Sequence, residues 1–246
     1  RRDYEKRYLN QGDSYKFNAD NLLSDTHVNL SNFFGSKEKN TFVIPNFSTG
    51  IRKITNYLPF NLNVLLIKDD YPSLVNAFDE KKFNIDSIDI QENLELEIER
   101  RIKYKKIDVL AISIVQYASG LLIDINFLKK LKSQYPDLII IGDGTQFLGA
   151  HNFDFNSSPF DVVAASGYKW LLAGFGNGVL MISDYYLSRI KKKAFDLHDD
   201  IFTGHFNILS VASLNFSIKN FQKNDFNKLI KHRSEEHTSE LQSPVT

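Results

Sequence analysis

Two stretches of the sequence decide the fold, residues 138–146 (LIIIGDGTQ) and residues 162–170 (VVAASGYKW). Each begins as a continuous apolar run and stops at polar residues. Continuous apolar runs of this length are typical of parallel strands, which are buried on both faces of a sheet. Open α/β sheets place their functional groups where such strands end. We therefore expect Asp143 and Lys169 to lie at neighbouring strand ends.

Strand and helix patterns alternate around these two stretches, from Thr41 onward. Predicted strands lie at residues 42–45, 64–67, 83–90, 109–115, 138–143, 162–165 and 179–182. Predicted helices include residues 51–58, 94–104, 125–134, 185–193 and 208–221. The alternation predicts a three-layer α/β/α fold, with helices on both faces of a mostly parallel sheet of about seven strands. Because no repeat or linker interrupts the pattern, we expect residues 41–232 to form one domain.

The two ends of the chain differ from this middle part. Residues 1–40 are polar and rich in Asn, with only a weak helical pattern. Residues 233–246 (RSEEHTSELQSPVT) have no periodicity and resemble the translation of a sequencing adapter, so we set them aside as non-native. A disordered native tail is the alternative. We expect the natural protein to continue beyond His232, and we expect little turnover from residues 1–232 alone.

The composition excludes several classes of protein. Lys and Arg number 30 and Asp and Glu number 30, so there is no electrostatic reason to expect nucleic acid or an acidic membrane as a partner. The absence of Cys excludes disulfides, thiolate metal sites and a cysteine nucleophile within this chain. The apolar runs are too short to span a bilayer, and the sequence shows no signal peptide. We expect a cytoplasmic protein.

Three motifs in sequence order resemble those of the class V aminotransferase family. They are residues 143–146 (DGTQ), 166–169 (SGYK) and 174–178 (GFGNG). That family also contains cysteine desulfurases, selenocysteine lyases and kynureninases, and the resemblance covers residues 41–221. It implies the large domain of a type I pyridoxal phosphate-dependent transferase, with the small C-terminal domain beyond His232.

The resemblance assigns the cofactor ring to three residues. Lys169 matches the lysine that forms a Schiff base with the aldehyde of pyridoxal phosphate. Asp143 matches the aspartate that keeps the pyridine nitrogen protonated, so that the ring accepts electrons from a substrate carbanion. Gln146 matches a residue that hydrogen-bonds the phenolate oxygen. A surface lysine, a turn aspartate and a polar loop residue are the plain structural alternatives.

Other residues match the family's phosphate site. Free N–H groups and the dipole at a helix N-terminus favour a phosphate. Ser48 and Thr49 precede the predicted helix 51–58 and resemble the family's phosphate-binding turn, but they suit an ordinary helix cap equally well. Ser166 and Tyr168 precede Lys169. A Tyr at 168 departs from the His of desulfurases and is closer to kynureninases, and its hydroxyl can still donate to phosphate.

Three further residues are expected at the site. Tyr71 stands where desulfurases have a ring-stacking His; it can stack on the ring, but it cannot carry a proton near neutral pH. A half-buried core aromatic is the alternative for Tyr71. Gln116 resembles its kynureninase counterpart and is expected to reach cofactor or substrate. His205 lies in a segment that, by resemblance, crosses a homodimer interface toward the partner's phosphate; a solvent-exposed loop His is the alternative.

These expectations leave three functions open. The first is an enzyme of transferase or lyase type that transforms an amino acid through a Lys169 Schiff base. The second is a cysteine desulfurase, selenocysteine lyase or kynureninase-like hydrolase, for which the substrate-binding Arg or reactive Cys would lie beyond His232. The third is an α/β protein that binds a cofactor without turnover. The glycines at 174–178 do not match the dinucleotide-binding fingerprint and are expected to let the backbone turn closely beside the cofactor.

Overall fold

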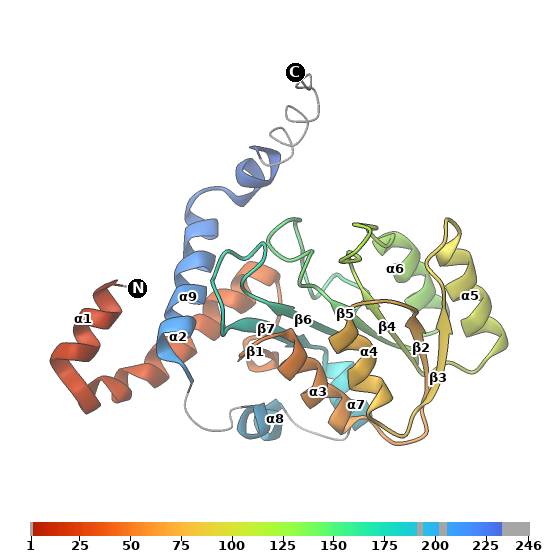
Figure 1. The fold of residues 1–246 in the computed structure, drawn as a ribbon, viewed down its shortest axis with the longest axis horizontal. Coiled ribbons are helices and arrows are strands. Elements are labelled where there is room, and N and C mark those ends of the chain that lie inside the picture. The colour runs from red at the N-terminus through yellow and green to blue at the C-terminus, as the bar shows by residue number, and fades with distance from the viewer. Residues whose placement is uncertain (1, 191–193, 202–205, 233–246) are drawn as a thin grey trace.

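A seven-stranded sheet forms the centre of the molecule (Figure 1) in the computed structural model, which describes residues 2–190, 194–201 and 206–232. The strand order is β1-β7-β6-β5-β4-β2-β3, and only β7 runs against the other strands. The strands are β1 (Thr41–Ile44), β2 (Asn63–Ile67), β3 (Asn84–Ile88), β4 (Val109–Ser113), β5 (Ile139–Asp143), β6 (Val162–Ser166) and β7 (Gly178–Ile182). The expected mostly parallel sheet is confirmed.

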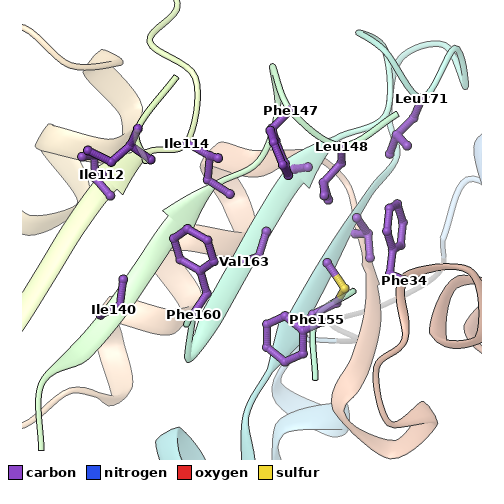
Figure 2. Close-up of a cluster of buried hydrophobic side chains, with 14 of the residues drawn as sticks. Phe34, Ile112, Ile114, Ile140, Phe147, Leu148, Phe155, Phe160, Val163 and Leu171 are labelled. Carbon is purple, nitrogen blue, oxygen red and sulfur yellow. The ribbon is translucent and has the colours of Figure 1, made fainter. Parts of the chain in front are cut away.

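Helices cover both faces of this sheet, which confirms the three-layer prediction. One face packs against α2 (Phe17–Phe34), α5 (Leu94–Tyr104), α6 (Ile125–Gln134) and α9 (Ile208–Lys223). The other packs against α3 (Phe47–Tyr57), α4 (Pro72–Asp79), α7 (Asp184–Ile190) and α8 (Ala194–Ile201). Successive strand residues point to opposite faces, so Ile140 joins the first core while Ile139 and Ile141 join the second. In the first core, Ile112, Ile140 and Val163 of three adjacent strands lie around Phe160 (Figure 2).

Helix α3 begins earlier than the sequence pattern predicted. The predicted start was residue 51, but the helix begins at Phe47. Asn46 is the N-cap, because its Oδ1 accepts a hydrogen bond from Thr49 N at 2.8 Å. Ser48 and Thr49 therefore lie inside the first turn of the helix, where N–H groups have no partner within the helix.

The region before β1 is helical, although its sequence pattern is weak. It contains α1 (Arg2–Gln11), the 3₁₀ turns η1 (Gly12–Lys16) and η2 (Glu38–Asn40), and α2. Helix α2 lies beside α9, buries Leu30 and Phe34, and is joined to α9 by a hydrogen bond from Asn29 Nδ2 to Asn215 Oδ1 at 2.8 Å. Packing of this kind stabilises a helix whose own propensity is low. Among the described helices, none combines the length and apolar character needed to cross a bilayer.

The parallel strands bring four connections to one edge of the sheet. These connections follow β2, β4, β5 and β6, and they contain Asp70, Gln116, Gln146 and Lys169. The register sets Ser113 opposite Asp143 on the neighbouring strand. Residues 191–193 at the end of the predicted helix 185–193, residues 233–246 and His205 lie outside the described residues.

Candidate functional site

Asp143 is a buried acid at the centre of this edge. It is the last residue of β5, is 4% exposed, and its Oδ1 accepts a hydrogen bond from Thr145 N at 2.8 Å. Burial raises the pKa of Asp143 to about 7; hydrogen bonds from Thr145 lower it, and the negative charge of Asp70 raises it. No cation among the described residues offsets that burial. Such a carboxyl gains stability from a positively charged or protonated partner.

A second buried carboxylate, that of Asp70, lies near Asp143. It is 3% exposed and follows β2. Its Oδ2 accepts from Ser113 N at 2.9 Å and Gln116 Nε2 at 3.1 Å, and its Oδ1 accepts from Ser113 Oγ at 2.5 Å and Tyr71 N at 2.6 Å. Asp70 was not among the site residues predicted from the sequence. Its position, as an acid between a predicted strand and Tyr71, was the one available signal.

Aromatic rings gather beside these two acids. The Tyr71 ring lies 5.9 Å from Phe47 and 5.7 Å from Tyr117 between centroids, the latter pair edge to face. Burial raises the pKa of Tyr168, with Tyr71 and then Asp143 adding to the effect, so these three side chains lie within electrostatic range of one another. The structure thus brings together three residues that were selected from the sequence at the ends of three different strands.

Lys169 lies on the exposed loop after β6, and its Nζ is 5.5 Å from the centroid of the Tyr168 ring. The next residue, Trp170, donates from Nε1 to Gln146 Oε1 at 3.2 Å. Gln146 is on the loop that follows Asp143, the last residue of β5. The indole therefore joins the loop between β6 and β7, which contains Lys169 and is called the lysine loop below, to the loop that follows Asp143. The sequence alone did not indicate this contact.

Asn177 also holds the lysine loop in place. Asn177 Nδ2 donates to Ala173 O at 2.9 Å and to Ser210 O of α9 at 3.0 Å, and Gly167 N donates to Asn177 O at 2.9 Å. A Cβ on Gly167 would lie 1.9 Å from Asn177 Oδ1, so only glycine fits at that position. Gly174 and Gly176 have φ of 72° and 80°, which glycine adopts readily, and they turn the chain back into β7.

The expected phosphate residues gather at the N-terminus of α3. Ser166 Oγ accepts from Phe47 N at 2.9 Å, Thr49 Oγ1 donates to Asn46 Oδ1 at 3.1 Å, and Ser48 Oγ donates to Ser73 Oγ at 2.7 Å. Within the described residues, Ser48 N–H makes no hydrogen bond. The hydroxyls of Ser166 and Thr49 thus bond to the first turn of α3 and its cap, and that of Ser48 bonds to α4, while a backbone donor and the positive end of the helix remain without a partner in the described residues.

Gln116 lies on the loop after β4. It is buried, and its Nε2 donates to Asp70. His205 lies outside the described residues. Three further residues, besides Asp70, were not predicted from the sequence, because their contacts depend on how the strand ends align: Ser113, Trp170 and Asn177.

Comparisons with known proteins agree with this architecture. A family model for class V aminotransferases matches residues 14–242, whereas no curated protein sequence matches the chain. A variant of C-DES, with glycine covalently linked to its PLP cofactor, has a TM-score of 0.82 at 13% identity over 93% of this chain and 68% of that chain. The apo cysteine desulfurase from Thermococcus onnurineus NA1 has a TM-score of 0.71 at 17% identity, covering 92% of this chain and 64% of that one.

Ureidoglycine–glyoxylate aminotransferase from Bacillus subtilis is also similar, with a TM-score of 0.72 at 15% identity, covering 86% of this chain and 60% of that one. At these identities the likeness shows the fold alone, and the chain spans less than two thirds of the last two structures. The family model covers most of the sequence, including the sheet and the loops that contain Asp143 and Lys169. The chain belongs to the class V aminotransferase family.

Proposed function

We propose that this protein is a pyridoxal phosphate-dependent enzyme that acts on an amino acid, with Lys169 as the residue that binds the cofactor. The observation that supports this most directly is Asp143. It is a buried carboxyl at a strand end, with a pKa raised to about 7 and no cation beside it in the described part of the chain. A pyridine nitrogen can share a proton with such a group, and the lysine loop is tied to the same strand end through Trp170.

The residues around Asp143 suit a flat heteroaromatic ring. The half-buried ring of Tyr71 offers an aromatic face for offset stacking. Because Gln146 Oε1 already accepts from Trp170, its Nε2 is left to donate to a ring oxygen. These positions agree with the roles that the family resemblance assigns to Tyr71, Gln146 and Asp143.

The N-terminus of α3 suits the phosphate. Ser48 N–H and the helix dipole favour an anion there, and the hydroxyls of Ser166, at the end of β6, and of Thr49 hydrogen-bond to the first turn and its cap. Tyr168 can add a phenol donor from the lysine loop. His205 of the partner subunit would complete this site in a homodimer, according to the resemblance.

Bound pyridoxal phosphate would supply an electron sink for charge that develops on the substrate α-carbon. Asp143 would hold a proton at the ring nitrogen, which maintains that sink. Lys169 would bind the cofactor through its amine, and the same amine would move the proton at the substrate α-carbon. Tyr71 orients the ring, and the Trp170–Gln146 contact keeps Lys169 and Asp143 on one site.

An exposed apolar rim around the site supports a homodimer. Leu172 and Phe175 on the lysine loop are 61% and 83% exposed, and Tyr117 and Leu122 on the loop after β4 are also exposed. Exposed large apolar side chains that gather at one site mark interfaces. A second copy of the chain is the occupant that the family resemblance implies.

Trapping of the cofactor tests the proposal. Borohydride reduction of the protein incubated with pyridoxal phosphate should fix the cofactor to Lys169, as read by peptide mass spectrometry. Lys169→Ala should abolish the label and the associated visible absorption, whereas Lys130→Ala, an exposed lysine on α6, should leave both unchanged. Labelling at another lysine, or no labelling at all, would refute the proposal.

Exchange of the substrate proton separates an enzyme from a protein that only binds the cofactor. In deuterated water, the full-length natural protein should exchange the α-proton of its amino-acid substrate, as read by proton NMR, and Lys169→Ala should not. Cofactor binding without exchange for any of the common amino acids would favour the non-catalytic alternative. Release of both alanine and sulfide from cysteine, in the presence of a thiol reductant, would identify a cysteine desulfurase.

A further inference from the structure

We propose that Asp70 is a positioning residue of this site. It fixes the position of Tyr71 relative to the strand end that bears Asp143, and its own carboxylate lies beside the carboxyl of Asp143. The inference deepens the proposed function, because a bound ring would use both Tyr71 and Asp143. Its structural basis is a set of contacts within the protein itself.

Asp70 fixes the connection that presents Tyr71. The chain turns sharply after β2, where Asp69 adopts a φ of 60° and Asp70 N donates to Ile67 O at 3.3 Å. Asp70 Oδ1 then accepts from Tyr71 N at 2.6 Å, directly before α4 begins at Pro72. Since Tyr71 has no capping side chain of its own, the Asp70 carboxylate sets the direction in which the Tyr71 backbone, and hence its ring, leaves the turn.

The same carboxylate holds the neighbouring strand end. It accepts from both the N–H and the hydroxyl of Ser113, and from the side-chain amide of Gln116. Ser113 lies opposite Asp143 in the register of β4 and β5, and the following residue, Ile114, donates from N to Asp143 O at 2.9 Å. Asp70 therefore reaches Asp143 through two consecutive residues of one strand end, and a displaced carboxylate would move Tyr71 and this strand end together.

Asp70 also acts on Asp143 through its charge. Its partners among the described residues are all neutral donors, so the negative charge is solvated by hydrogen bonds and is not cancelled. The other groups that face Asp143 are the hydroxyl and N–H of Thr145 and the phenol of Tyr168; Lys169 follows Tyr168 on the same loop. Two buried carboxylates at close range disfavour two negative charges, so the site favours a proton on Asp143 or on a ring that pairs with it.

A purely structural role for Asp70 would give a different experimental result. If Asp70 only stabilised the loops, removing its charge would lower the free energy of unfolding but would leave the titration of Asp143 where it is. The titration of Asp143 therefore separates the two roles, and it can be measured without any cofactor.

The experiment compares Asp70→Asn with Ser113→Ala in the cofactor-free protein. Carbon-13 NMR of labelled aspartate, assigned with Asp143→Asn, should show Asp143 titrating at about pH 7 in the wild type. Asp70→Asn should move this midpoint to lower pH, because a neighbouring negative charge is lost. Ser113→Ala removes one donor to Asp70 but retains the charge, so it should leave the midpoint raised. An unmoved midpoint in a folded Asp70→Asn protein would overturn the electrostatic part.

Asp70→Glu tests the positioning part and serves if Asp70→Asn fails to fold. It keeps the charge but lengthens the side chain, so Asp143 should still titrate near neutrality while the Tyr71 connection is displaced. Binding of pyridoxal phosphate, read by its absorption, should weaken about tenfold or more, the loss expected when one positioned interaction is misplaced. Wild-type affinity in Asp70→Glu would overturn positioning. If the wild type binds no pyridoxal phosphate, the proposed function fails, yet the NMR titration still decides the electrostatic role of Asp70.

Discussion

Gly167→Ala should be among the most destabilising single-methyl additions in the chain. The new Cβ would lie 1.9 Å from Asn177 Oδ1 and 3.1 Å from its Cγ, so the Asn177 side chain must leave its position. It would lose its hydrogen bonds to Ala173 O and Ser210 O, both in buried surroundings. Two such bonds, at about 1–1.5 kcal/mol each, together with about 1–2 kcal/mol of overpacking, predict a loss of roughly 3–5 kcal/mol in the free energy of unfolding.

Urea unfolding would measure this loss, with a double-mutant cycle to assign its cause. In an Asn177→Ala background the close contacts with the Asn177 side chain are gone and Ala173 Cβ, at 3.2 Å, remains as a tight neighbour, so adding the methyl should cost about 1 kcal/mol. Gly120→Ala is the control for backbone strain alone, because its Cβ meets no atom within 4 Å although its φ is 71°; we expect a loss of about 1 kcal/mol there. If Gly167→Ala costs the same with and without Asn177, the steric explanation is wrong.

Two further predictions concern buried charges. The pKa of Asp143 in the folded protein, about 7, lies above its value in the unfolded chain, so the folded state binds the proton more tightly. The contribution of this group to the free energy of unfolding is therefore present at acid pH and is lost as pH rises toward 7. Asp143→Asn should therefore gain stability relative to wild type as pH rises from about 4 to 7, by up to roughly 4 kcal/mol in urea unfolding; parallel pH profiles would contradict this. Lys132→Met leaves the buried carboxylate of Asp161 without the Nζ that contacts it at 2.7 Å and should lose about 2–4 kcal/mol in the free energy of unfolding. Lys68→Met breaks an exposed pair with Asp89 and should leave the free energy of unfolding nearly unchanged. Equal losses in the two variants would show that burial does not set the value of the pair.

The sheet could be predicted because its signal is local. Strands β4, β5 and β6 are buried at every position, so their sequences are continuous apolar runs that can be recognised without knowing their neighbours. Helices α5 and α6 were predicted with the bounds that the structure shows. Residues 1–40 were not recognised as helical, because the partner that stabilises α2 is α9, at the other end of the sequence.

The site could be predicted only in part, for the same physical reason. Asp143 and Lys169 end apolar strands, so their sequence context marks them. Asp70 was missed because its partners Ser113 and Gln116 are 43 and 46 residues away, and only the alignment of parallel strands brings them together. The start of α3 was misplaced because Asn46 was not recognised as the cap, although Asn is among the residues favoured at that position.

The pairing of α2 with α9 has a consequence for synthesis on the ribosome. Asn29 and Asn215 are separated by 186 residues, so α2 emerges long before the helix against which it packs. At about 5–20 residues per second, the ribosome needs roughly 10–40 seconds to deliver that partner, and Leu30 and Phe34 lack one of their packing surfaces for that time. The nascent chain should therefore recruit chaperones to its first helices early, and release them only once translation has passed α9.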